Sequence, residues 1–190
     1  MSPLTEADQQ ELLRLAREAL VGYLNLGEIP KVPEPAETLR QPCGAFVTLR
    51  KGKNLRGCIG VIAADNPLYT TVRECAVWAA VQDPRFAPVT KQELKELNLE
   101  ISVLSPLSDI APENIEVGRH GLIISHHGLR GLLLPQVAVQ WKWNREQFLE
   151  ETCRKAGLPI DAWRQGARVQ AFTAQVFEEP HTARSSHPAT

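Results

Sequence analysis

The sequence predicts an α+β fold with a mainly antiparallel sheet and flanking helices. Two observations support this. Segments with strand-like patterns come in pairs joined by short turns, which is typical of hairpins, and helical patterns lie between the pairs. The regular alternation of single strands and helices that a doubly wound parallel sheet requires is missing. With 190 residues, the chain has the length of one domain or of two small lobes.

The chain begins with a predicted helix and a long connection. Apolar residues recur at helical spacing over 6–24, and Thr5 and Asp8 have the spacing of a capping box at its start. Four prolines in 25–42 argue against a regular helix or a central strand there, so this segment is predicted to be an ordered surface connection.

A hairpin and a second helix are predicted next. The patterns of 43–50 and 55–62 indicate two antiparallel strands joined by a glycine-containing turn. Asn66 followed by Pro67 gives the N-cap and the first residue of a helix over 67–82.

The second half of the chain predicts a further set of short elements. Thr90 and Glu93 form a capping box for a short helix over 91–97, and apolar residues then alternate over 97–103 as in a half-buried strand. The remaining patterns predict a second hairpin over 120–125 and 129–134, a helix that begins after Asn144 and ends at Gly157, and a last strand over 167–177.

Composition narrows the classes of function. The net charge is −1, with 23% charged residues, which argues against coating of nucleic acid or anionic membrane through bulk charge. No apolar run reaches the roughly 18 residues of a membrane span, and the polar, acidic start does not resemble a signal peptide. We therefore expect a soluble, cytoplasmic protein. Its scattered cysteines are then expected to be free thiols: Cys43, Cys58, Cys75 and Cys153.

The candidate functional segment is Leu55-Arg56-Gly57-Cys58-Ile59-Gly60. Glycine weakens a strand, so Gly57 and Gly60 indicate that another element or a ligand approaches the backbone closely. Arg56 and Cys58 share one face of the strand, where the guanidinium would favour the thiolate. Cys58 is thus a candidate nucleophile or soft ligand, and Arg56 a candidate tuning residue. A buried, purely structural Cys58 is the alternative.

Other candidates lie outside this strand. Asp83 and Arg85 follow the second helix, either as a supporting pair or anion clamp near Cys58 or as a structural turn with one ion pair. His120 is a candidate base for Cys58 or a ligand-binding residue. No zinc-like spacing, Walker motif or dinucleotide fingerprint occurs, so neither a metal nor a cofactor is predicted. Four cations in 50–56 leave nucleic-acid binding as the lowest-ranked function.

The hexapeptide resembles the signature of the AMMECR family, and further segments of the family pattern follow in the expected order over about residues 8–179. They are G-A-F-V-T-L at 44–49, D-P-R-F at 83–86, E-L-K-E-L-N-L-E-I-S-V-L-S at 93–105, G-R-H-G-L at 118–122, L-L-P-Q-V-A at 133–138 and K-A-G-L-P at 155–159.

The resemblance implies one α+β domain of two unequal lobes over 1–179, with the connection 25–42 inside it and the hexapeptide near the cleft between the lobes. The polar composition of 180–190 predicts a disordered tail. Prokaryotic members of the family resemble component A of the AmmeMemoRadiSam system, which implies a Memo-like protein and a radical SAM protein as partners.

The sequence therefore supports two functions almost equally. In the first, the hexapeptide is an active or ligand-binding site with Cys58 as nucleophile or ligand. In the second, the chain is a non-catalytic adaptor that acts beside the Memo-like and radical SAM proteins, and the glycines admit a partner strand or peptide. The sequence does not decide whether the protein is an enzyme, which reaction or ligand it takes, or its oligomeric state.

Overall fold

The fold is α+β, as the sequence predicts, and it is organised as two compact units. A computed structural model describes residues 3–62 and 65–180. One unit, here called the inserted unit, spans Val103–Gln175. The other, here called the main unit, is built from the chain up to Ser102 and from Val176 onward. The predicted disordered tail lies, apart from Pro180, outside the described residues.

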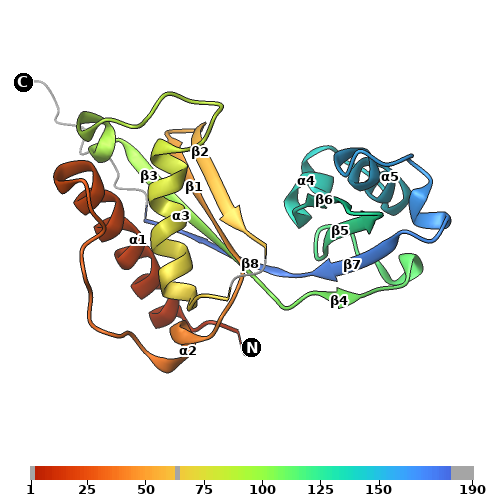
Figure 1. Cartoon of the computed structure of the whole chain (residues 1–190), viewed down its shortest axis with the longest axis horizontal. Coiled ribbons are helices and arrows are strands. Elements are labelled where there is room, and N and C mark those ends of the chain that lie inside the picture. The colour runs from red at the N-terminus through yellow and green to blue at the C-terminus, as the bar shows by residue number, and fades with distance from the viewer. Residues whose placement is uncertain (1–2, 63–64, 181–190) are drawn as a thin grey trace, which may run out of the picture. The chain divides into compact units, whose positions relative to one another are not determined.

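The main unit contains a four-stranded sheet with the order β2-β1-β3-β8 (Figure 1). The predicted first hairpin is confirmed, because β1 and β2 pair antiparallel with a bulge between Leu49 and Arg50. The strands of this sheet are β1 (Ala45–Lys51), β2 (Asn54–Val61), β3 (Leu97–Leu104) and β8 (Ala174–Glu178). Since β2 ends this order, no strand among residues 3–62 and 65–180 pairs with its second edge.

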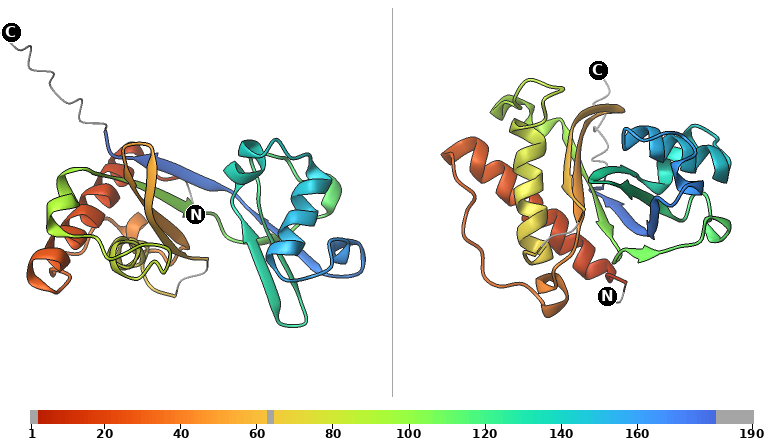
Figure 2. Two further views of the ribbon diagram at one scale, coloured as in Figure 1. Left: turned by 90° about the horizontal axis from the view of Figure 1, so that it is seen from above. Right: turned by 45° about the vertical axis from the view of Figure 1, so that its right-hand side comes forward.

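Two helices cover one face of this sheet. Helix α1 (Glu6–Leu26) packs on α3 (Leu68–Val81), and α3 packs directly on β1 and β2; both helices lie on the same side of the hairpin in Figure 2. The capping box of Thr5 and Asp8 is present at the start of α1. Alternate residues of β1 and β3 point toward the helices and are buried, and they form the core of this unit with the apolar faces of α1 and α3: Ala45, Val47, Leu49, Leu99 and Ile101.

Gly57 allows α3 to lie close to β2. A Cβ atom at this position would lie 2.0 Å from the carbonyl oxygen of Ala79, well inside van der Waals contact. The obstacle is helix backbone, which cannot rotate away as a side chain can. The absence of a side chain at Gly57 therefore sets the distance between β2 and α3.

The connection before the sheet differs from the prediction in two places. A single helical turn, α2 (Glu37–Arg40), forms where the sequence predicted no helix, because the stretch from 36 to 41 contains no proline. Pro67 is the N-cap of α3 rather than its first residue, with extended backbone angles. The reason is that Pro67 bridges Pro42, and the N–H of Leu68 donates to Gln41.

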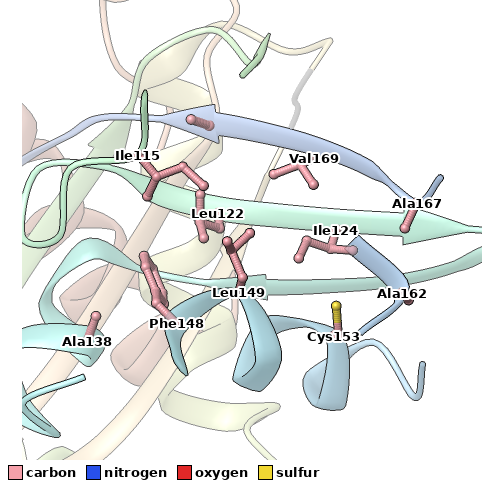
Figure 3. Packing of buried hydrophobic residues seen from close by; sticks show 11 residues of the cluster. Ile115, Leu122, Ile124, Ala138, Phe148, Leu149, Cys153, Ala162, Ala167 and Val169 are labelled. Carbon is pink, nitrogen blue, oxygen red and sulfur yellow. The ribbon is translucent and has the colours of Figure 1, made fainter. Parts of the chain in front are cut away.

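The inserted unit has its own four-stranded sheet with the order β4-β7-β5-β6. The predicted second hairpin is confirmed as β5 (Gly121–His126) and β6 (Leu129–Leu133), and the predicted helix is α5 (Arg145–Lys155), which begins with a capping box. Figure 3 shows Phe148, Leu149 and Cys153 of α5 against Leu122 and Ile124 of β5. The other elements are β4 (Ser108–Asp109), α4 (Pro135–Gln140), β7 (Arg168–Phe172) and the 3-10 helices Pro112–Asn114 and Ala162–Arg164.

The predicted last strand over 167–177 is wrong as one element. It divides at Thr173 into β7 and β8, which belong to different sheets. The carbonyl of Thr173 accepts the N–H of Ser105 at 2.8 Å, and its own N–H donates to the Ser105 hydroxyl at 2.9 Å, so the chain is held here by a short reciprocal contact. The short helix predicted over 91–97 is a 3-10 helix over Lys91–Lys95 with its capping box intact.

No helix among the described residues combines the length and the apolar character needed to cross a membrane.

The close approach of α3 to β2 is tested by Gly57→Ala. The added methyl group meets the Ala79 carbonyl oxygen, so we expect the free energy of unfolding to fall by roughly 1–3 kcal/mol. Urea denaturation of the full chain measures this change. Leu55→Ala, at a more exposed position of the same strand, serves as the control and should cost less than about 1 kcal/mol. Equal stability of Gly57→Ala and the unmodified protein would contradict the packing argument.

Candidate functional site

Cys58 lies on the end strand β2, on the face turned away from α3. Its neighbour Gly57 faces the helix, and successive side chains of a strand point to opposite faces. Cys58 pairs with Thr48 across the hairpin, and the Thr48 hydroxyl donates a hydrogen bond of 3.2 Å to the Cys58 sulfur. The four cysteines are free, and Cys58 alone among them is partly exposed. Thr48 was missed by sequence reasoning, because the predicted hairpin register pairs Cys58 with Val47. The bulge between Leu49 and Arg50 shifts the pairing by one residue and brings Thr48 opposite Cys58.

Asp83 and Arg85 bind the backbone of Cys58. The N–H of Cys58 donates to Asp83 Oδ2 at 2.9 Å, and Arg85 Nη2 donates to the carbonyl oxygen of Cys58 at 3.3 Å. Both backbone groups of Cys58 point away from β1, toward the edge at which no other described strand pairs with β2. The pair therefore satisfies the two backbone groups that a further strand would otherwise bind.

The Asp83 carboxylate is stabilised in its charged form. Arg85 binds it through two side-chain nitrogens, at 2.9 Å from Nε and 2.6 Å from Nη2, and through its own N–H at 3.1 Å. These bonds, led by the Arg85 guanidinium, and the N–H of Cys58 hold the pKa of Asp83 well below its usual range despite burial. The Asp83 side chain is only 2% exposed, whereas that of Arg85 is 54% exposed. A buried anion thus has a cationic partner that still reaches solvent.

The guanidinium of Arg56 is bound away from Cys58. Its Nε donates to Glu93 at 2.9 Å, and its Nη1 donates to the carbonyl oxygen of Ala87 at 2.9 Å. Glu93 also accepts the N–H of Thr90 at 2.9 Å. Arg56 was predicted to tune Cys58, but among the described residues its guanidinium makes no hydrogen bond to Cys58. The guanidinium that binds Cys58 belongs to Arg85. Arg56 instead ties the segment after α3 to β2.

Other parts of the same chain occupy the space beside both glycines of the hexapeptide. Gly57 admits the backbone of α3, as described above. A Cβ atom at Gly60 would lie 2.2 Å from the ring of Phe46 and 2.5 Å from the carbonyl oxygen of Ala45, both on the paired strand β1. Of the two explanations that the sequence left open, another element rather than a ligand accounts for each close approach in this structure.

His120 belongs to the inserted unit. Its Nδ1 accepts the N–H of Glu116 at 3.0 Å, so this imidazole serves in a local turn. Its predicted role as a base for Cys58 stays a prediction. Within residues 3–62 and 65–180, no three or more His, Cys, Asp or Glu side chains gather in a way that could hold a metal ion.

The chemistry open to this site follows from these contacts. A partly exposed thiol can act as a nucleophile or as a soft ligand. In the described part of the chain, no imidazole or carboxylate is hydrogen-bonded to the sulfur, so no general base is in place. What the site offers instead is a fixed thiol, a hydroxyl donor from Thr48, and a half-exposed guanidinium from Arg85.

Acid stability tests the link between Arg56 and Glu93. The bonds from Arg56 and Thr90 lower the pKa of Glu93 to about 2. A carboxyl whose pKa is lowered on folding stabilises the protein above its unfolded pKa of about 4.3, and this stabilisation is lost as the pH falls toward 2. We therefore expect the free energy of unfolding to fall less steeply between about pH 5 and 2 in Glu93→Gln than in the unmodified protein. Urea denaturation at each pH measures both slopes.

Glu116→Gln is the matched control, because Glu116 forms an exposed ion pair with Arg119. This variant should keep the slope of the unmodified protein. Identical slopes in all three proteins would show that the Arg56–Glu93 pair does not form.

Comparison with known proteins agrees with this fold. The sequence model of the AMMECR1 family matches residues 13–177. A protein of Thermococcus gammatolerans is 45% identical over 184 residues, covering 90% of this chain and 89% of that protein. A protein of Methanothermobacter thermautotrophicus is 42% identical over 187 residues, covering 94% and 97%.

A solved structure is also similar. The crystal structure of the uncharacterized protein PH0010 from Pyrococcus horikoshii superposes with a TM-score of 0.82 at 43% identity, covering 89% of this chain and 90% of that one. A family match over most of the chain, relatives above 40% identity and a shared fold agree with one another. The chain belongs to the AMMECR1 family.

Proposed function

We propose that the segment 55–60 forms an active or ligand-binding site in which Cys58 is the nucleophile or ligand and Arg85 binds an anionic group beside it. The observation that carries this proposal is the double attachment of Arg85 to the Cys58 carbonyl and to the buried Asp83 carboxylate. This attachment keeps a positive charge beside the one partly exposed thiol.

The Arg85 guanidinium has capacity left for a ligand. Its Nε and Nη2 bind Asp83 and Cys58, while Nη1 makes no hydrogen bond to any described residue. Guanidinium groups recognise carboxylate and phosphate oxygens. A small thiol-reactive or thiol-binding molecule that carries such a group would thus be oriented toward the sulfur.

Arg56 acts in this proposal as a positioning residue. Through Glu93 and the carbonyl oxygens of Ala87 and Pro88, it holds the segment that carries Asp83 and Arg85 against β2. The tuning role predicted for Arg56 is then an indirect one, exerted through the placement of Arg85.

The adaptor function is the second candidate, with a Memo-like protein and a radical SAM protein as partners in the cytoplasm. Docking of a partner strand on β2 at Cys58 would have to displace Asp83 and Arg85, because these residues occupy its backbone groups. A partner would therefore have to dock elsewhere. The occupied strand edge and the half-exposed guanidinium favour a small-molecule site at Cys58.

Alkylation with a matched pair of reagents tests the proposal. Iodoacetate carries a negative charge and iodoacetamide does not, so their rate ratio at one thiol reports the local positive charge. We expect Cys58 to react before the other cysteines. The ratio of its iodoacetate rate to its iodoacetamide rate should be about threefold to tenfold higher than that of a free thiol, and Arg85→Gln should return the ratio to the free-thiol value. Mass spectrometry resolves the four cysteines.

The other cysteines are internal controls. Burial raises the pKa of the Cys43 and Cys153 thiols and that of Cys75 to about 12, so these should react only on unfolding. Arg154→Gln, on the exposed side of α5, should leave the ratio at Cys58 unchanged. A Cys58 that is as inert as the buried thiols, or a ratio that Arg85→Gln leaves unchanged, would overturn the proposal.

A further inference from the structure

A second group of polar side chains lies on the sheet of the inserted unit. Ser125 of β5 pairs with Arg130 of β6 on one side and with Arg168 of β7 on the other. Directly paired residues share a face of the sheet, so the two arginines flank Ser125 in one row. Two strand spacings of about 4.8 Å separate their backbones by roughly 10 Å, which long arginine side chains can span.

This row lies on the face opposite α5. A Cβ atom at Gly131, the neighbour of Arg130, would lie 2.4 Å from the backbone nitrogen of Ala156, at the end of α5. Gly131 therefore faces the helix, and Arg130 faces away from it because side chains alternate along a strand. The row is thus free of the helix that covers the other face.

A hollow of about 720 Å³ opens over this row. Besides Ser125 and the two arginines, its lining includes His126 and the side-chain amide of Gln170, and it includes no aspartate or glutamate. All of these polar side chains can donate hydrogen bonds. The volume lies within the range of about 300–1,000 Å³ that is typical of small-molecule sites.

The charges in the hollow are only partly balanced. Arg168 binds Asp109 through Nε at 2.8 Å and Nη2 at 3.1 Å, with both side chains largely exposed. Arg130 makes no ion pair with any described residue. Asp109 lies on β4, beyond Arg168 of β7, so one carboxylate against two cations leaves a net positive charge.

The conformation of the turn beside the hollow is fixed by its own backbone. His127 and Gly128 have φ angles of 47° and 84°, and they form the two-residue connection between the paired residues His126 and Leu129. Two successive left-handed residues are the mark of a tight hairpin turn that matches the twist of its strands. The hairpin therefore holds its end of the hollow in place without a ligand.

We propose that this hollow binds a phosphate group. Arg130 supplies paired donors of the geometry that phosphate oxygens accept, and Ser125 supplies a neutral donor beside it. Arg168, whose Nε and Nη2 are bound to Asp109, contributes its remaining nitrogen, and Gln170 also hydrogen-bonds Asp109. Asp109 already balances Arg168, so Arg130 is the cation that lacks a partner among the described residues. A phosphate group has more acceptor oxygens than a carboxylate, so it can bind Arg130, Ser125 and the remaining nitrogen of Arg168 at once. The site lies in the inserted unit and does not depend on the role of Cys58.

Binding is tested on the full chain by isothermal titration with three probes at low salt: pyrophosphate, adenosine monophosphate and a twelve-nucleotide single-stranded RNA. We expect saturable binding of at least one probe, weakened about tenfold in Arg130→Gln and in Arg168→Gln. Arg154→Gln is the matched control, since its side chain is 63% exposed against 61% for Arg168 and it lies on α5. This variant should bind as the unmodified protein does.

The three probes also separate the possible sources of the phosphate group. Binding of pyrophosphate or the nucleotide assigns the hollow to a small phosphorylated molecule, and binding of the RNA alone assigns it to a nucleic-acid backbone. Asp109→Asn frees Arg168 and should tighten binding about twofold to fivefold. Absence of binding by all three probes, or an equal loss in Arg154→Gln, would overturn the proposal.

Discussion

The Asp83 carboxylate links the end strand β2 to the turn that follows α3. It accepts the N–H of Cys58 at the strand edge, and it is bound in turn by the guanidinium of Arg85. Burial of a carboxylate is costly unless it is paired and hydrogen-bonded, and here both conditions are met. Gly57 already fixes the distance between β2 and α3. The Asp83 carboxylate then fixes the positions of the Cys58 backbone and of the Arg85 guanidinium relative to each other.

The same contacts explain why the hexapeptide has its composition. Gly57 and Gly60 make room for Ala79 and Phe46, and Arg56 reaches across the strand edge to Glu93. Cys58 lies partly exposed, and among the described residues the Thr48 hydroxyl is the one group hydrogen-bonded to its sulfur. A strand edge closed by side chains rather than by another strand leaves that thiol accessible. In the proposed site, the residues that build the strand edge are thus distinct from Cys58, the residue that would meet a ligand.

Local sequence patterns predicted the hairpins, the capping boxes that begin at Thr5, Thr90 and Asn144, and the turn that carries Asp83 and Arg85, because each depends on neighbours within a few residues. They failed where distant contacts decide. The pattern of 167–177 is continuous, but pairing with two different sheets divides it at Thr173. Arg56 and Cys58 were predicted to share a face, but a bulge leaves Arg56 without a partner on β1, and its long side chain reaches Glu93, 37 positions away. The reason for Gly57 could not be read from the strand, since the atom that requires it lies on α3.

Hydrogen exchange of the Cys58 amide tests the central claim most directly. This amide points away from β1, so without Asp83 it would face solvent and exchange like the amide of an open strand edge. If the carboxylate binds it, Cys58 in the native protein exchanges as slowly as the amides paired between β1 and β2, and Asp83→Ala removes that protection. Fast exchange of the Cys58 amide in the unmodified protein, beside slow exchange of the paired hairpin amides, would contradict the account.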